Sequence, residues 1–492
     1  MQRRTRAVAA LGFLGCLLVA AFPFSVEVMH PSLSSWFDDH LGFWRRPAGR
    51  DLSAALALIG SVLMFWCWTR LHPSVSGLRT SGLVAIGVLW TLPLLVVPPF
   101  STADPYAYAA QGWILSQGRN PYLVPMGTPS PFSFGVYPAW APTTAVYPPW
   151  ALFVQQFVVE ATGAHWYWSV AAMRLIAIAG VVLMVAIAGP LARAVGADTS
   201  LARWAIAVNP LVILQLIGGS HNDALMIGVM MVALWAARRY GLIAGALGIG
   251  VATCFKQAAA LAGLAVVLLA MQRRPPALPE SPPEQDFSAR RRPASLRWHL
   301  AVLWRTCVAA AIAGGFFAVT SKLSGIGLGW LRDSAGSPGL VISHAPISWL
   351  SQLAVGPLGL DPDTVTTVVS GLCALAMLVA GVWLYLRLAH RRPMTLGAGA
   401  LLAFGLLSPA VQPWYVLWGG PLLAFERQRA WVSQAAVSVV LLLLCSTIIQ
   451  HWIGPPVAIP IAAVIAAAWY VKGPRIGSTS AGTTTRSRAG SA

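Results

Sequence analysis

The sequence has 492 residues, of which 57% are hydrophobic and 10% are charged, and its formal net charge is +18. Soluble domains carry about 25% charged residues, so this composition excludes a soluble globular protein and is typical of a polytopic membrane protein. In a soluble protein this charge would suggest nucleic-acid binding. Here the basic residues lie in short loops between apolar runs, which indicates membrane topology and no nucleic-acid partner.

Apolar runs recur along the whole chain and predict an all-α protein with about 14 transmembrane or half-transmembrane helices. Several runs are shorter than the ~20 residues that cross a bilayer, so some are expected to be half-helices. The first run follows a basic start, Met1–Arg6, and is expected to be a retained signal-anchor helix. In chain order the expected helices lie near residues 8–24, 52–69, 82–98, 168–191, 204–217, 224–238, 241–254, 258–271, 300–320, 368–388, 397–408, 414–425, 431–449 and 456–472.

These runs divide the chain into five parts. They are two additional N-terminal spans (1–81), a central module with an outer loop at 99–167 (82–272), a cytoplasmic linker (273–299), C-terminal spans with an outer loop at 321–367 (300–472) and a cytoplasmic tail (473–492). The linker is rich in Pro, Glu and Arg, and the tail is rich in Ser, Thr and Gly. Both compositions are typical of disordered segments.

The distribution of basic residues predicts the orientation in the cell membrane. With both termini in the cytoplasm, most arginines fall on the cytoplasmic side, as the positive-inside rule requires. The outer side keeps only Arg45, Arg46, Arg50, Arg119, Lys256, Lys322 and Arg332. This count holds only if the segment 147–162 does not cross the membrane, so we expect it to form an outer-surface or re-entrant helix.

Asp104 is the first candidate functional residue, because it follows the third apolar run and opens a loop rich in Pro and aromatic residues. The stretch that begins there is also a good helix start, so the carboxylate could serve only as an N-cap. Alternatively, it could take a proton from a hydroxyl group during glycosyl transfer at the outer membrane surface. The same stretch supplies Tyr106, Tyr108 and Gln111 as candidate substrate-binding residues.

A second polar group, His221, Asn222 and Asp223, lies between two apolar runs. Ionisable residues are costly at membrane depth and usually line a cavity, so these three are candidates to bind sugar hydroxyls or a phosphate. A plain polar turn is the alternative. A metal site would need further ligands at a suitable spacing, which the sequence lacks, so no metal is expected.

Further candidates lie near the expected outer side. Arg174 and Lys256 interrupt apolar stretches, where each could bind a phosphate or extend towards the membrane interface. Gln412, Trp414 and Tyr415 form a polar and aromatic break that could stack on a sugar or anchor the chain at the interface.

The chain resembles the actinobacterial polyprenol-phosphate-mannose-dependent α-(1→6)-mannosyltransferases, which belong to the GT-C superfamily of integral membrane glycosyltransferases. The resemblance runs from about Ser101 to Tyr415 and is carried by motifs in the expected order. These are Asp104–Gly112, Asn120-Pro-Tyr122, Tyr147-Pro-Pro149, Asn209-Pro-Leu211, Gly218–Leu225, Lys256 and Gln412–Tyr415.

The resemblance implies a GT-C-like fold in which 82–272 is the conserved module and helices lie on the outer surface after the third span. It implies transfer of mannose from a polyprenyl-phosphate donor to a lipomannan-type glycolipid acceptor on the outer face of the membrane. The role of catalytic carboxylate falls on Asp104. Some GT-C families carry paired acids where this chain has one, which favours a reaction without a metal cofactor.

The mechanism expected from the resemblance is a single displacement with inversion that forms an α-(1→6) linkage. Arg174, Lys256 and His221 would stabilise the leaving phosphate, and aromatic residues would line the sugar or prenyl groove. One alternative keeps the fold and changes the sugar, for instance to arabinofuranose. The other is a transporter or flippase for a lipid-linked sugar, against which stand the absence of internal repeats and the long outer loop.

Overall fold

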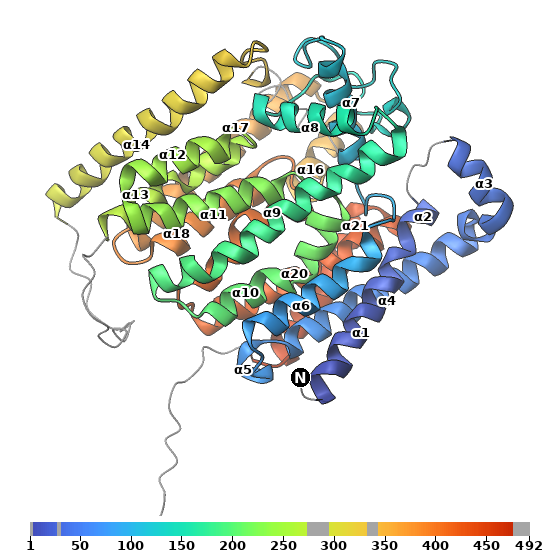
Figure 1. Cartoon of the computed structure of the whole chain (residues 1–492), viewed down its shortest axis with the longest axis horizontal. Coiled ribbons are helices and arrows are strands. Elements are labelled where there is room, and N and C mark those ends of the chain that lie inside the picture. The colour runs from blue at the N-terminus through green and yellow to red at the C-terminus, as the bar shows by residue number, and fades with distance from the viewer. Residues whose placement is uncertain (1–2, 27–30, 273–294, 332–342, 476–492) are drawn as a thin grey trace, which may run out of the picture.

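The computed structural model describes residues 3–26, 31–272, 295–331 and 343–475. Within these ranges all regular structure is helical and no strand occurs, which confirms the predicted all-α membrane protein. The helices pack side by side over most of the molecule, and α1 runs upward from the N-terminus at the lower edge of the view (Figure 1).

The α-helices that the structure describes are α1 (Arg3–Ala20), α2 (Phe22–Val26), α3 (Pro31–Leu41), α4 (Pro47–Arg70), α5 (Pro73–Ser76), α6 (Thr80–Thr91), α7 (Asp104–Ser116), α8 (Pro149–Ala161), α9 (Trp166–Val195), α10 (Thr199–Ala207), α11 (Asp223–Tyr240), α12 (Leu242–Thr253), α13 (Gly263–Met271), α14 (Leu296–Leu323), α16 (Pro346–Val355), α17 (Pro362–Leu388), α18 (Pro393–Leu407), α19 (Val416–Gly419), α20 (Ala430–Ile453) and α21 (Pro455–Lys472). Short 3₁₀ segments and one π-helix, η4 (Val212–Gly218), connect them.

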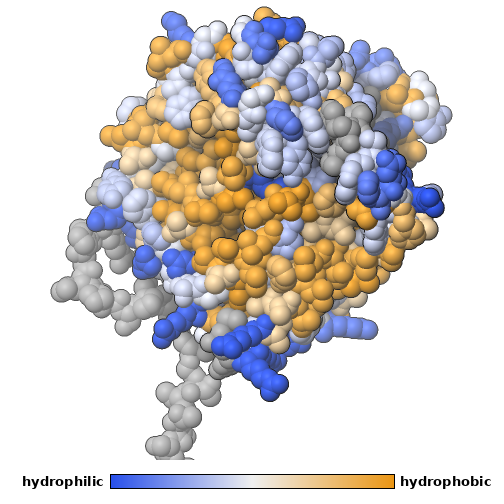
Figure 2. Space-filling view, turned by 45° about the vertical axis from the view of Figure 1, so that its right-hand side comes forward, coloured by the Kyte–Doolittle hydropathy of each residue, from blue (hydrophilic) through white to orange (hydrophobic). Residues whose placement is uncertain are grey.

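Among the described residues, 7 helices are long and apolar enough to cross a membrane, and the bent pair of α10 and η4 could form one more. The shorter apolar helices, including α6, α12 and α18, match expected half-helices by position. Figure 2 shows a broad hydrophobic belt across the middle of one face, with hydrophilic residues above and below it. A belt of this kind is what a bilayer covers.

Several expected boundaries differ from the structure; the helix expected over 204–217, for example, is bent by 53° between α10 and η4. The helix expected over 414–425 is broken into three short pieces, because Pro413 and Pro421 lack a backbone N–H and Gly419 and Gly420 favour a bend. The expected linker also ends earlier than residue 299, since α14 begins at Leu296. Most of the linker and of the expected tail lies outside the described residues.

The loop after the third span contains the helices α7 and α8, and their expected place on the outer surface stays a prediction. Each has 13 residues, whereas a helix needs ~20 residues to cross a bilayer. They lie together at the end of the molecule opposite the N-terminus (Figure 1). Their contact is close, because a Cβ on Gly112 of α7 would lie 2.5 Å from the backbone of Gln155 on α8.

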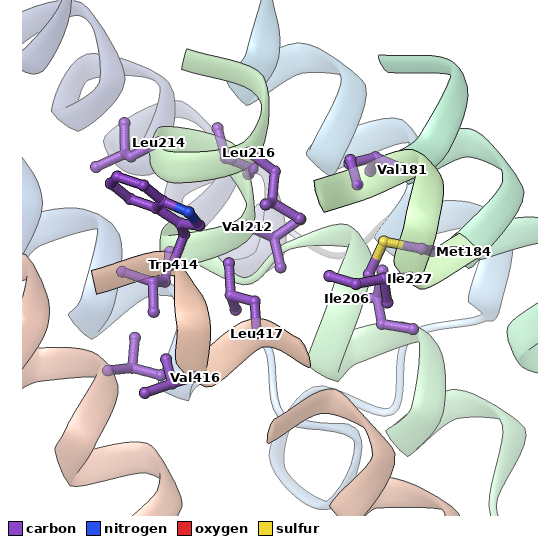
Figure 3. Close-up of a cluster of buried hydrophobic side chains, with 14 of the residues drawn as sticks. Val181, Met184, Ile206, Val212, Leu214, Leu216, Ile227, Trp414, Val416 and Leu417 are labelled. Carbon is purple, nitrogen blue, oxygen red and sulfur yellow. The ribbon is translucent and has the colours of Figure 1, made fainter. Parts of the chain in front are cut away.

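The main hydrophobic core lies directly next to this end. Figure 3 shows part of it, with side chains from α9, α10, η4, α11 and the segment 414–417 in one cluster. Trp414 belongs to this cluster. The core therefore fixes the position of η4 and of the chain that follows it.

Candidate active site

Asp104 begins α7 and is held by the loop before it. Its backbone N–H donates to Oγ1 of Thr102 at 3.1 Å, and Ser101 adopts a left-handed φ of 55°. The N-cap position belongs to Ala103, so the carboxylate does not act as the expected N-cap. Asp104 is 6% exposed, which is rare for an acid without a specific partner.

Two side chains contact the Asp104 carboxylate. Oδ2 accepts a hydrogen bond from the Tyr108 hydroxyl at 2.9 Å and lies 3.2 Å from Nδ1 of His221. Burial alone would raise the pKa of Asp104, but the hydrogen bond to His221, the charges of His221 and Lys256 and the hydrogen bond from Tyr108 bring it below its ordinary value. Asp104 is therefore an ionised, buried carboxylate at neutral pH.

His221 is positioned by an unusual turn. The N–H groups of Gly219 and His221 donate to the carbonyls of Leu214 and Leu216, each five residues earlier, which widens the helix at η4. Such π-turns are rare and frequent at functional sites. The His221 ring then stacks on Trp414 with centroids 3.7 Å apart.

The two loops that carry Asp104 and His221 are tied together. The N–H of Phe100 donates to the carbonyl of Gly218 at 3.0 Å. Arg174 of α9 reaches both loops, because its guanidinium donates to the carbonyls of Leu95, Val97, Ile217 and Gly218 at 2.8–3.3 Å. Arg174 is 2% exposed and holds the backbone here, and its expected contact with a phosphate stays a prediction.

Asp223 and Lys256 form an ion pair. Nζ of Lys256 lies 2.8 Å from Oδ1 of Asp223, and the same oxygen accepts from Nε1 of Trp418 at 2.5 Å. The Asp223 side chain is fully buried, whereas the Asp104 side chain keeps 8% of its surface accessible. Asp223 is thus neutralised by its partner and closed off from solvent.

Lys256 lies among aromatic rings. Its Nζ is 5.7 Å from the ring centre of Tyr147, 5.5 Å from that of Tyr415 and 5.2 Å from that of Trp418. Tyr415 and Trp418 stack on each other with centroids 4.1 Å apart. Cation–π contacts of this kind stabilise a partly buried ammonium group.

Tyr108 connects Asp104 with Asn222 and Tyr147. Its hydroxyl lies 3.4 Å from Oδ1 of Asn222 and 3.4 Å from the hydroxyl of Tyr147, besides its hydrogen bond to Asp104. Burial and the charge of Asp104 raise the pKa of Tyr108 well above its ordinary value, so the phenol keeps its proton. The structure thus brings most of the sequence-predicted residues into one polar cluster, which we call the Asp104 cluster: Asp104, Tyr108, His221, Asn222, Asp223, Lys256, Trp414 and Tyr415.

Besides Arg174, three predicted residues lie outside the Asp104 cluster. Tyr106 packs on the opposite side of α7, against Phe134 and the backbone of Gly135. Gln111 is 1% exposed and its amide contacts the sulfur of Met126. Gln412 precedes a 3₁₀ turn and is half-buried. Their expected contacts with a substrate stay predictions.

The structure adds two residues to the cluster, Tyr147 and Trp418. Tyr147 belongs to a recognised Tyr-Pro-Pro motif, so its position was available from the sequence. Trp418 lies in the stretch expected to be an apolar helix, where a tryptophan carries no signal of its own. Within the described ranges no group of three His, Cys, Asp or Glu side chains could hold a metal ion.

The fold and the cluster define an α-helical membrane protein in which two buried carboxylates, Asp104 and Asp223, contact His221 and Lys256. Two protein-family models match the chain. Residues 9–272 match the model of the "Alpha-(1->6)-mannopyranosyltransferase, N-terminal domain", and residues 346–472 match the MptB C-terminal domain. The chain belongs to this family of mannopyranosyltransferases.

Individual relatives agree. Alpha-(1->6)-mannopyranosyltransferase A of Mycobacterium tuberculosis is 30% identical over 452 residues, covering 88% of this chain and 84% of that protein. Two proteins of Corynebacterium glutamicum, alpha-(1->6)-mannopyranosyltransferases A and B, are 26% and 25% identical and cover 85% and 89% of this chain. The aligned regions cover 88% and 75% of those two proteins.

Proposed function

We propose that this protein transfers mannose from a polyprenyl-phosphate carrier to a mannosylated, lipomannan-type glycolipid, at the outer face of the cell membrane. The observation that carries the proposal is the environment of Asp104. This carboxylate is ionised, accepts hydrogen bonds on one oxygen and keeps 8% of its side-chain surface exposed, whereas the side chain of its neighbour Asp223 is fully buried and paired. An accessible carboxylate of this kind suits a general base.

The proposed step is a single displacement at the anomeric carbon. Asp104 accepts the proton of the acceptor 6-hydroxyl while the hydroxyl oxygen forms a bond to C1 of the mannosyl group. The bond between C1 and the phosphate oxygen breaks, and its electron pair leaves with the polyprenyl phosphate. Attack on a β-linked donor inverts C1 and leaves an α-(1→6) linkage.

The leaving phosphate gains negative charge during this step, and it needs a positive partner rather than a proton. Lys256 and, when protonated, His221 are the cationic groups of the cluster. We propose that these side chains stabilise the phosphate without a metal cofactor. We further propose that Trp414 and Tyr415 contact the apolar side of a sugar.

The choice of mannose over arabinofuranose rests on the relatives, which are named as mannopyranosyltransferases. A GT-C-type enzyme is favoured over a transporter by the packing around the cluster. Val212, Leu214 and Leu216 of η4 are buried with Leu417 in the hydrophobic core that adjoins His221 and Trp414 (Figure 3). A translocation path would need polar side chains there.

The test uses membranes that contain the protein, a radiolabelled polyprenyl-phosphate-mannose donor and mannosylated glycolipid acceptors. We expect Asp104→Asn to reduce transfer by about 10³-fold or more, because an amide cannot accept the proton. Asp363→Asn is the matched control, since Asp363 is an exposed acid in the first turn of another helix, α17. Linkage analysis of the product checks the α-(1→6) bond.

Equal transfer by Asp104→Asn and the control variant, at equal amounts of inserted protein, would contradict the role of Asp104. Absence of any transfer by the wild-type protein with this donor, combined with transfer from another lipid-linked sugar, would instead contradict the proposed donor.

A further inference from the structure

A small cavity lies next to the Asp104 cluster, between α7, α8, α9 and the turn before α11. Its volume is about 20 Å³, which is room for one hydroxyl group or water molecule. Gln155 of α8 projects into it together with Tyr108, Ser220 and Asn222. Apolar side chains, among them that of Phe255, form the remaining wall.

Three polar side chains of this cavity, Gln155, Ser220 and Asn222, have atoms without a hydrogen-bond partner. Gln155 is 3% exposed, and neither its Nε2 nor its Oε1 has a hydrogen-bond partner. The same is true of the hydroxyl of Ser220, which is 1% exposed, and of Nδ2 of Asn222. A buried polar group without a partner costs about 1–3 kcal/mol, and four such atoms around one cavity indicate that something binds there.

The donors and acceptors indicate the chemistry of the ligand. The Gln155 amide both donates and accepts, the Ser220 hydroxyl does either, and Nδ2 of Asn222 donates. A hydroxyl group of a sugar ring both donates and accepts, so it matches this set. Neither a cation nor an acid lines the cavity, which favours a neutral hydroxyl over a phosphate or an ammonium group.

The cavity is coupled to Asp104 through two of its lining residues. Tyr108 and Asn222 line it, and the Tyr108 hydroxyl binds Asp104 at 2.9 Å and approaches Asn222 at 3.4 Å. A sugar ring with one hydroxyl in the cavity would thus present the rest of the ring towards the carboxylate.

We propose that Gln155, Ser220 and Asn222 form a subsite for one hydroxyl group of a sugar ring at the reaction centre. This inference rests on the proposed function and adds a specificity-determining residue, Gln155, from the helix α8. The volume admits a hydroxyl group and excludes the ring itself, so the subsite recognises one edge of the sugar.

The experiment compares Gln155→Leu with Gln156→Leu in full-length protein. Gln156 is the next residue of the same helix, but its amide faces outward and donates to Glu160 at 2.8 Å. We expect Gln155→Leu to raise KM for one sugar substrate about tenfold, as loss of one good hydrogen bond does, with a smaller change in kcat. Gln156→Leu should leave both constants unchanged.

The substrate whose KM rises shows whether the subsite binds the sugar of the donor or that of the acceptor. An increase for polyprenyl-phosphate-mannose assigns the subsite to the donor, and an increase for the glycolipid assigns it to the acceptor. Analogues of that substrate, each lacking one hydroxyl, give a second readout. For the analogue that lacks the bound hydroxyl, kcat/KM of the wild-type protein should be about tenfold lower than for the unmodified substrate. Gln155→Leu should use this analogue and the unmodified substrate equally well.

Identical KM values for Gln155→Leu and Gln156→Leu, with no analogue discriminated, would overturn the inference and leave water as the occupant. If Gln155→Leu does not fold, Ser220→Ala serves the same test, because it removes a hydroxyl from the same cavity. A wild-type protein that transfers sugar normally separates this outcome from failure of the proposed function, in which wild-type transfer itself would be absent.

Discussion

Asp104 and Asp223 are two carboxylates in one cluster with opposite environments. Asp104 accepts from a phenol and a histidine and keeps part of its surface open, whereas Asp223 is sealed between Lys256 and Trp418. A charge with a close counterion and no access is poorly suited to take a proton from a substrate. The environment therefore assigns different roles to the two acids, a base and an anchor for the cation.

The contact with His221 sets the pH at which Asp104 loses its charge. Burial raises the pKa of Asp104 and His221 lowers it, so the pKa should rise when His221 is replaced by an apolar residue. Because the base works in its ionised form, the acidic limb of the pH profile of kcat/KM should move to higher pH in His221→Leu. An acidic limb that stays in place would contradict this coupling.

Several of these residues were predictable from the sequence one by one, since a polar residue in an apolar chain is conspicuous. Asp104, His221, Asp223 and Lys256 all drew attention for that reason. Their pairing was not predictable, because it depends on how α7, η4 and the Lys256 loop meet. Gln155 lies in an apolar stretch as an uncharged residue, so nothing marked it before its neighbours were known.

At the scale of elements, the backbones of α9 and α11 come into close contact at Gly180. A Cβ on Gly180 of α9 would lie 2.3 Å from the backbone of Ala224 and Leu225 on α11. Small residues allow such close approach of helices in membranes. The first turn of α11 carries Asp223, so this contact also fixes one acid of the cluster.

Gly180→Ala should therefore destabilise the protein by about 1–3 kcal/mol, because backbone atoms cannot move aside as a flexible side chain can. A lower Tm in detergent is the expected measurement. Gly315→Ala is the matched control, since Gly315 lies inside α14 with open space around it and should tolerate the methyl group. Equal Tm values for the two variants would show that the α9–α11 contact is looser than the structure indicates.

Helices long enough to span were predictable from their apolar runs, as α4, α9 and α20 show. The segment 414–425 was not, since its composition is apolar although its backbone is broken by Pro and Gly. Hydropathy measures the preference of side chains for lipid, and it does not record where the backbone can continue a helix. The break matters because it places Trp414, Tyr415 and Trp418 in the cluster.

At the scale of the whole molecule, α7 and α8 lie at one end, and α5 lies at the other end with the N-terminus (Figure 1). The hydrophobic belt lies between these two ends (Figure 2). The expected orientation, with the Asp104 cluster outside and the N-terminus inside, stays a prediction that the positive-inside rule supports.

Single cysteines test this orientation. Gln117, just after α7, and Arg79, just before α6, are both exposed and lie on opposite sides in the expected topology. A membrane-impermeant maleimide should label Gln117→Cys on intact cells and Arg79→Cys only after permeabilisation. The wild-type protein measures the background from its own cysteines, of which Cys307 alone is exposed among the six. The reverse labelling pattern would overturn the expected topology.

The π-helix η4 has one more consequence. An α-helix turns by about 100° per residue, and a π-turn accommodates one residue more than an α-turn does. The extra residue therefore acts as a phase shift between the buried face of η4 and the turn that follows it. Without it, the apolar side chains could keep their places only if His221 pointed in another direction. The extra residue in η4 therefore sets the direction in which the His221 side chain points, which is towards the Asp104 carboxylate.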